Sequence, residues 1–120
     1  MSFDWTHFLD VARDLADNSD LDTEARLRSA VSRAYYAAFN HARTYLTSRG
    51  VTFFREFGDH ERVLEQLRSH GHTDLADELY RMRRWRNRAD YDTGHSDFRL
   101  MWIGSNAGAQ AIIDSLTPSD

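Results

Sequence analysis

The chain has 120 residues, a length typical of one domain, and its formal net charge at pH 7 is −4. A negatively charged protein does not attract nucleic acid as a whole, so any such attraction has to be local. Cysteine is absent, which excludes disulfides, a thiol nucleophile and a cysteine-based zinc site. No apolar run reaches the ~18–20 residues that span a bilayer, and the N-terminus lacks a signal-peptide pattern. We therefore expect one cytoplasmic domain over residues 1–120, without a membrane partner.

All 15 basic residues are arginine and none is lysine. A composition bias of a whole genome produces such a skew, so the number of arginines is not evidence for phosphate binding. Their placement in the chain is the informative feature.

The spacing of apolar residues predicts a helix in the first segment. Asp4 is a suitable N-cap for this helix, which is expected to end at the polar run Asn18-Ser19-Asp20. Its apolar residues recur at intervals of three and four and form one face: Trp5, Phe8, Leu9, Ala12, Leu15 and Ala16.

A long second helix is predicted over residues 23–49, with Asp22 as N-cap and Gly50 as C-terminal stop. One apolar row contains Leu27, Val31, Ala34, Ala38, His41 and Tyr45, and an adjacent row contains Tyr35, Phe39, Ala42 and Leu46. A polar strip contains Arg26, Ser29, Arg33, Asn40 and Thr47. A helix with so wide an apolar surface has to be covered on most sides. We expect a second copy of the chain to provide part of that cover.

The middle of the chain is predicted to hold a packed aromatic connector and two more helices. The connector covers residues 51–57, and Asp59 then caps a short helix. The apolar residues of this short helix are Val63, Leu64 and Leu67. Thr73 caps a fourth helix, which reaches about Asp90.

A last helix is predicted over about residues 96–116, where Phe98 begins the apolar face. Its middle, Gly104-Ser105-Asn106, is poor helix material, so we expect a kink or break there. No segment shows the alternation of a strand. The sequence therefore predicts an all-α fold, a four- to five-helix up-and-down bundle.

Arginines are concentrated in the fourth helix. Five of the eight residues from 81 to 88 are arginine and none is acidic. Arg81, Arg84 and Arg88 share one helix face, which indicates either a strip that contacts phosphates or a solvated charged face. On the second helix, Tyr36 lies between Arg33 and Asn40, where it is either an exposed stacking residue or a contact at the rim of the core.

Arg86 differs from the other arginines because it falls on the apolar face of its helix. That face steps through Leu75, Leu79, Met82, Arg86 and Ala89. Burying a guanidinium costs several kcal/mol unless it is paired. Asp90, one turn later, is an available partner, so one hypothesis is an internal Arg86–Asp90 bridge. The other is an arginine held in a groove, at a dimer interface, where its planar fork binds a phosphate.

Two segments of the chain resemble the HEPN (higher eukaryote and prokaryote nucleotide-binding) family. Residues 28–39, RSAVSRAYYAAF, resemble the long second helix of small bacterial and archaeal HEPN proteins, and residues 85–91, WRNRADY, resemble the arginine-and-asparagine motif of a later helix. The similarity covers residues 21–116. It implies a helical bundle that forms a homodimer, with the paired motifs facing each other. Many members are metal-independent ribonucleases that act as toxins or in phage defence.

The resemblance implies a catalytic role for Arg86 and Asn87, which match the first two motif positions. In such enzymes the ribose 2′-hydroxyl attacks its own phosphodiester, a base takes the proton, and arginine stabilises the transition state. The motif histidine is missing: Tyr91 follows four intervening residues, and His95 lies outside the usual spacing. Tyrosine, with a pKa of ~10, is a poor base at neutral pH.

Three functions stay open from the sequence. The first is an RNA- or nucleotide-directed HEPN module, a ribonuclease toxin or defence component, with Arg33, Tyr36, Arg81, Arg84 and Arg88 as binding residues. The second is a catalytically inactive dimeric interaction protein whose partner is a nucleotidyltransferase or an antitoxin. The third is a sensor of a free nucleotide.

The remaining histidines are weaker candidates for a site. His41 lies on the inner face of the second helix, where a satisfied core histidine is favoured over a catalytic base. His70 and His72, with Asp74, sit in a turn without a fourth ligand, so we expect no metal site and no cofactor. His60, before Glu61, is expected on the surface.

Overall fold

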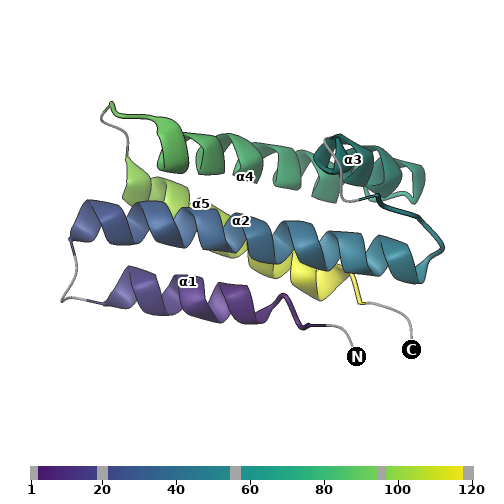
Figure 1. The fold of residues 1–120 in the computed structure, drawn as a ribbon, viewed down its shortest axis with the longest axis horizontal. Helices are drawn as coiled ribbons and strands as arrows, with labels where there is room; N and C mark the ends of the chain where they lie inside the picture. The colour runs from purple at the N-terminus through teal and green to yellow at the C-terminus, as the bar shows by residue number, and fades with distance from the viewer. Residues whose placement is uncertain (1–2, 19–21, 55–57, 95–96, 118–120) are drawn as a thin grey trace.

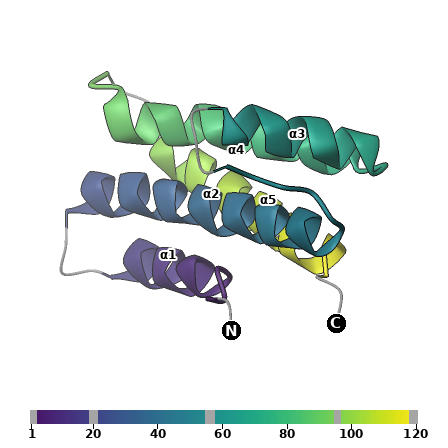
Figure 2. The same ribbon diagram turned by 45° about the vertical axis from the view of Figure 1, so that its right-hand side comes forward.

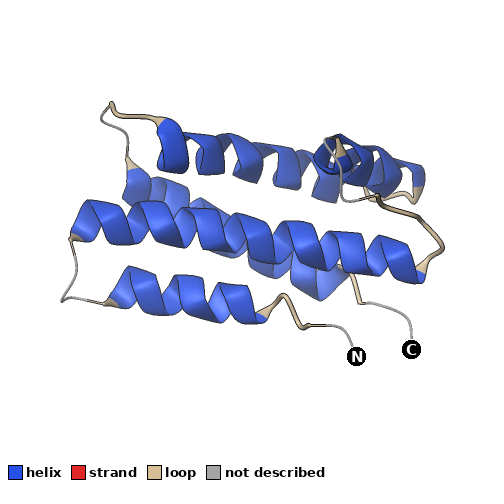
Figure 3. Cartoon of the chain, in the orientation of Figure 1, coloured by secondary structure: helices blue, strands red, loops and turns tan. Residues whose placement is uncertain are grey.

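The computed structural model describes residues 3–18, 22–54, 58–94 and 97–117. These residues form five α-helices and no strand (Figure 3). The helices are α1 (His7–Asp17), α2 (Thr23–Ser48), α3 (Asp59–Ser69), α4 (Thr73–Tyr91) and α5 (Phe98–Ser115). The prediction of an all-α fold is confirmed. Of the helices described, none combines the length and the apolar character that crossing a bilayer requires.

Four helices, α1, α2, α4 and α5, lie lengthwise and α3 crosses them steeply, so that Figure 1 shows α3 nearly end-on. Following the chain, α2 runs opposite to α1, α4 opposite to α2, and α5 opposite to α4 (Figure 1). The turned view shows α3 and α4 on one side of α2 and α1 on the other (Figure 2). The up-and-down order therefore holds for these four lengthwise helices, with α3 packed as an extra helix against α4.

Helix α2 is the central element of the bundle. Its 26 residues span ~39 Å at 1.5 Å per residue, close to the 43 Å long axis of the molecule. The Asp22 side chain accepts a hydrogen bond from the Ala25 amide at 2.9 Å, as an N-cap does. At the other end Gly50 has a φ of +92°, and the Val51 amide donates back to the Leu46 carbonyl at 3.0 Å. This is a Schellman ending, which needs a left-handed residue.

The other predicted caps are displaced by one or two residues. The Asp4 carboxylate accepts from the Thr6 amide and hydroxyl, and α1 begins only at His7. Asp59 is the first residue of α3, after Gly58 at φ +107°, and Thr73 is the first residue of α4; neither helix has a side-chain N-cap bond. The prediction that Asp4, Asp59 and Thr73 are N-caps was wrong.

The predicted polar strip of α2 contains one residue that the structure buries. Asn40 is buried, and its amide donates to the Tyr36 carbonyl at 2.9 Å while its oxygen accepts from Arg43 at 2.7 Å. Both polar ends of the side chain are satisfied within the same helix. An asparagine can therefore lie against the core at low cost.

Helix α5 is continuous, which corrects the prediction of a break at Gly104-Ser105-Asn106. A Cβ atom at Gly104 would stand 2.5 Å from the Trp85 ring, so the missing side chain lets α5 approach α4 closely. On another face of α5, Asn106 accepts a hydrogen bond from Arg13 of α1 at 2.9 Å. Poor helix formers are kept here because packing requires them, and packing outweighs propensity.

Arg28 ties the C-terminus of α4 to α2. Its guanidinium donates to the carbonyls of Ala89 at 3.1 Å and Asp92 at 2.6 Å, and it lies 4.2 Å from the centre of the Phe98 ring. Terminal carbonyls of a helix have no partner within the helix, so a cation there is favourable. The end of α4 is thereby fixed against both α2 and α5.

Substitution of Gly104 by alanine tests the close approach of α4 and α5. Alanine has the higher helix propensity by about 1 kcal/mol, but the rigid Trp85 ring blocks its Cβ. We expect Gly104→Ala to lower the free energy of unfolding by about 1–3 kcal/mol in urea titrations. Gly108→Ala is the matched control, since its Cβ meets mainly the flexible side chains of Glu78 and Met82. A Gly104→Ala protein at least as stable as Gly108→Ala would contradict this account.

Candidate functional site

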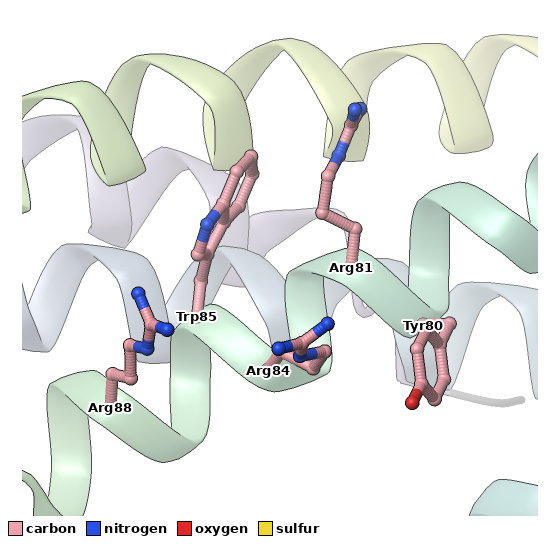
Figure 4. A pocket seen from close by; sticks show the side chains of 5 residues that line it. All are labelled: Tyr80, Arg81, Arg84, Trp85 and Arg88. Atoms are coloured by element: carbon pink, nitrogen blue, oxygen red, sulfur yellow. The ribbon is translucent and has the colours of Figure 1, made fainter.

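A hollow of about 360 Å³ lies on α4, and arginines and aromatic rings make its wall. Its lining residues are Tyr80, Arg81, Arg84, Trp85 and Arg88 (Figure 4). All five come from α4, and Trp85 and Arg81 extend from it toward α5 (Figure 4). The prediction that Arg81, Arg84 and Arg88 share one face of a helix is confirmed by this geometry.

The charge of the hollow is only partly compensated. Arg81 pairs with Glu78 of its own helix, and its guanidinium lies 5.2 Å from the centre of the Trp85 ring. Among the described residues, no ion pair within 4.0 Å involves the side chain of Arg84 or Arg88. Both are exposed. Two positive charges therefore remain available to an anion.

The aromatic residues of the hollow offer flat surfaces next to these charges. The half-buried Trp85 ring is held by the backbone of α5 at Gly104, whereas Tyr80 is exposed. Guanidinium groups bind phosphate oxygens, and an aromatic ring stacks on any nucleobase. The hollow is therefore suited to a nucleotide or to a short piece of single-stranded nucleic acid.

Arg86 lies on a different face of α4 from the hollow. Its side chain is only 14% exposed and its Nη1 atom is 3.8 Å from the Asp90 carboxylate. Its guanidinium lies 5.1 Å from the centre of the Tyr35 ring and 5.4 Å from that of Tyr36, both on α2. The internal bridge between Arg86 and Asp90 is thus present, although 3.8 Å is too long for a hydrogen bond. The charge is therefore paired with Asp90 and also lies over the rings of two tyrosines.

The other predicted site residues are spread over separate surfaces. Asn87 is exposed, and Tyr91, the last residue of α4, is 74% exposed. These two share an outward face, four residues apart, while Arg86 faces inward. Tyr36 is half-buried and lies beneath Arg86. This position corresponds to a contact at the rim of the core and not to an exposed stacking residue. Arg33 reaches the Phe8 ring of α1 at 5.8 Å. Within one chain these residues do not converge with the hollow.

A cluster that no sequence pattern predicted forms where α2, α3 and α4 meet. His60 was expected on the surface, and this was wrong. The ring of His60 is half-buried, its Nδ1 atom bonds the Tyr35 hydroxyl, and it stacks on Phe39 at 5.7 Å between centroids. Burial, together with the charges of Arg83 and Arg86, lowers the pKa of His60 to about 3. The histidine is therefore neutral at physiological pH.

The remaining histidines have structural partners. His41 donates a ring N–H to the Leu116 carbonyl at the end of α5, which matches the favoured interpretation of a satisfied histidine. The His70 ring bonds the Gln66 carbonyl at 2.8 Å, and His72 contacts the Tyr45 hydroxyl at 3.2 Å. Within the described ranges, no group of three histidine or acidic side chains is placed to hold a metal ion. His95 lies outside the described residues.

Comparison of the chain with protein-family models, with characterised proteins and with solved structures finds no match. The residues of the hollow and of the His60 cluster therefore have to be judged by their own geometry.

The pH dependence of stability tests the environment of His60. Its native pKa of about 3 lies below the ~6.5 of an unfolded histidine. Between these two values the unfolded chain binds more protons at His60 than the folded chain does. The stabilisation of the fold by the neutral His60 ring is therefore complete above pH 6.5 and is lost as the pH falls toward 3. We expect the free energy of unfolding to decrease from pH 6.5 to 5, above the range in which carboxylates titrate.

Substitution by glutamine separates His60 from the other histidines. His60→Gln should flatten the decrease between pH 6.5 and 5, measured by urea unfolding at several pH values. His70→Gln, at the exposed C-terminal end of α3, is the control and should keep the wild-type slope. Equal slopes for wild type and His60→Gln would show that this ring is solvated in solution.

Proposed function

We propose that the chain is an RNA- or nucleotide-directed module of the HEPN type, and that it binds its ligand through the hollow on α4. One observation carries the proposal: three arginines and two aromatic rings line the same hollow, and two of the arginines have no carboxylate partner in the described part of the chain. The ligand class follows from that combination of charge and flat apolar surface.

The physical basis of the proposed binding is local, since the whole chain carries a net charge of −4. Arginines that neutralise phosphates release condensed counterions, which gives affinity that falls with salt. Stacking of a base on an aromatic side chain contributes about 1–3 kcal/mol. The Arg81 guanidinium already lies next to the Trp85 ring. A nucleobase that stacks on Trp85 would therefore also lie close to a positive charge.

The proposed relationship to the HEPN family adds a biological role to this binding. Residues 85–91, which carry the resemblance, supply Trp85 and Arg88 to the hollow and Arg86 to the interior. We propose a toxin-like or defence-associated component that binds RNA whether or not it also cleaves it. Cleavage would require a base, and Tyr91 stands where the motif histidine is expected.

Removal of single arginines tests the hollow. Arg84→Ala and Arg88→Ala should each weaken the binding of a fluorescein-labelled single-stranded RNA by roughly fivefold to tenfold, a loss of about 1–1.4 kcal/mol. Each should also lower the slope of log affinity against log salt by about 1, because one phosphate contact is lost. Fluorescence anisotropy over a series of salt concentrations measures both quantities.

Arg49→Ala is the matched control for this experiment. Arg49 is an exposed arginine at the C-terminus of α2, so its removal changes the net charge equally without touching the hollow. It should leave the affinity within twofold of wild type. A wild-type protein that binds neither RNA nor nucleotides, or an equal loss in Arg49→Ala and Arg84→Ala, would overturn the proposal.

The second candidate function, a dimeric interaction protein, is favoured by the outer face of α5. Leu100 and Ile103 are 63% and 57% exposed, and Ala107 and Ala111 continue the same exposed face at intervals of four. Such a face is available for a second copy of the chain, or for a protein partner such as a nucleotidyltransferase. We propose the homodimer as part of either function.

Sedimentation equilibrium tests the homodimer. Wild type should sediment as a dimer at micromolar concentration, and Ile103→Glu should sediment as a monomer, because it buries a charge in the proposed interface. Phe54→Glu, which alters an exposed aromatic residue on the connector, should remain dimeric. A monomeric wild type that also captures no partner counts against the interaction function.

A further inference from the structure

Buried polar atoms without a hydrogen-bond partner are concentrated at one place in the described part of the chain. Five side-chain atoms are of this kind, and four of them belong to Asp59, His60, Arg83 and Arg86. These four residues come from the N-terminal turn of α3 and the facing surface of α4. Native proteins satisfy nearly all such atoms, so a cluster of them indicates an absent partner.

The Tyr35–His60 hydrogen bond bears on the position of the proton on the histidine ring. Burial raises the pKa of the Tyr35 phenol, which therefore keeps its proton, and we assign the phenol as the donor to the Nδ1 atom of His60. A neutral imidazole that accepts at Nδ1 carries its own proton on Nε2. The unpartnered Nε2 atom of His60 is therefore an N–H donor that lacks an acceptor.

The two arginines contribute donors of the same kind. Carboxylates engage their outer ends: Arg83 Nη1 is 2.9 Å from Glu61, and Arg86 Nη1 is 3.8 Å from Asp90. The Nε–H groups of both arginines are buried and have no acceptor among the residues that the structure describes. The charges of both arginines act on the pKa values of His60 and Tyr35, and the Arg86 guanidinium lies 5.1 Å from the centre of the Tyr35 ring.

The fourth unpartnered atom is an acceptor and does not complete this set. The Asp59 Oδ2 atom lies 3.6 Å from Arg43 of α2, so its charge is compensated without a hydrogen bond. Three N–H donors, two of them on guanidinium groups, remain without an acceptor. A ligand that satisfies them needs several acceptor oxygens and a negative charge.

We propose that Arg83, Arg86 and His60 form a binding site for a phosphate group between α3 and α4, separate from the hollow that Arg84 and Arg88 line. The tetrahedral ion supplies one oxygen to each donor and opposes both guanidinium charges. The same chemistry fits a free phosphate ion and the phosphate of a nucleotide. The site does not depend on RNA binding at the hollow.

Arg83 is the more accessible of the two arginines. Its side chain is 34% exposed, against 14% for Arg86, and the Nε atoms of both are covered. The carboxylate on Arg83 belongs to Glu61, which is 68% exposed, and exposed ion pairs contribute little to stability. A phosphate can therefore displace that carboxylate at low cost.

Titration of the full chain with inorganic phosphate, at constant ionic strength set with sodium chloride, tests the proposal. The melting temperature should rise with phosphate and its dependence should saturate, as for a ligand of the native state. In nitrogen-15 NMR spectra, the Nε–H resonances of Arg83 and Arg86 should shift along the same binding curve. This second readout needs no substitution, so it holds even if a variant fails to fold.

Two lysine substitutions one residue apart provide the matched comparison. Arg83→Lys keeps the charge but removes the Nε–H group, and it should weaken phosphate binding at least tenfold. Arg84→Lys, on the face of the hollow, should leave it within twofold of wild type. No saturation, or unmoved Nε–H resonances, would overturn the proposal. A loss in Arg84→Lys rather than Arg83→Lys would place the phosphate in the hollow and would overturn it equally.

Adenosine 5′-monophosphate in a parallel titration distinguishes the source of the phosphate. Shifts of the same two Nε–H resonances by both compounds support a site that accepts a nucleotide phosphate. Shifts by inorganic phosphate alone support a site that admits only the free ion. A failure of RNA binding at Arg84 and Arg88 would leave these results intact.

Discussion

The stacking of the Arg86 guanidinium on Tyr35 and Tyr36 sets the rotation of α4 in the bundle. A charged group that is mostly buried tolerates few positions, since it must stay against the two rings and near Asp90. Residues two positions away on a helix point about 200° away. With Arg86 facing α2, Arg84 and Arg88 have to face outward. One inward arginine therefore determines that the other two line the hollow.

The interface of α2 with α3 and α4 contains a series of polar contacts. Four residues of α2 make polar contacts with these helices. Along the chain, Arg28 bonds the end of α4, Ser32 bonds Asp90, Tyr35 bonds His60, and Arg43 pairs with Asp59. Directional contacts of this kind permit only one register between helices, whereas apolar side chains tolerate several. We infer that these contacts specify how α2 and α4 align and that the apolar residues supply most of the stability.

The order and extent of the helices could be predicted because they depend on local patterns. The apolar rows of α2, with Asp22 and Gly50 at its ends, were sufficient to place it within one residue. The features that could not be predicted depend on residues distant in sequence. Gly104 weakens α5 by itself and is explained only by Trp85, and His60 looks like a surface residue until Tyr35, 25 positions earlier, is placed beside it. Arg81, Arg84 and Arg88 were predictable as one face because a single helix carries them, but the absence of acidic partners for two of them among the described residues was not.

The two proposed anion sites lie on opposite faces of one helix, so their mutual repulsion decides whether both can be filled. A helix with its side chains is about 10 Å across. Two unit negative charges at that separation repel by about 1.7 kcal/mol at an effective dielectric constant of about 20, and salt screens a partly buried pair only weakly. That repulsion alone would weaken binding at the second site by roughly 20-fold. Residues 81–88 carry five arginines and no acid, so two bound anions still leave this segment with a net positive charge, which offsets the repulsion. The hollow and the cluster can therefore be occupied together.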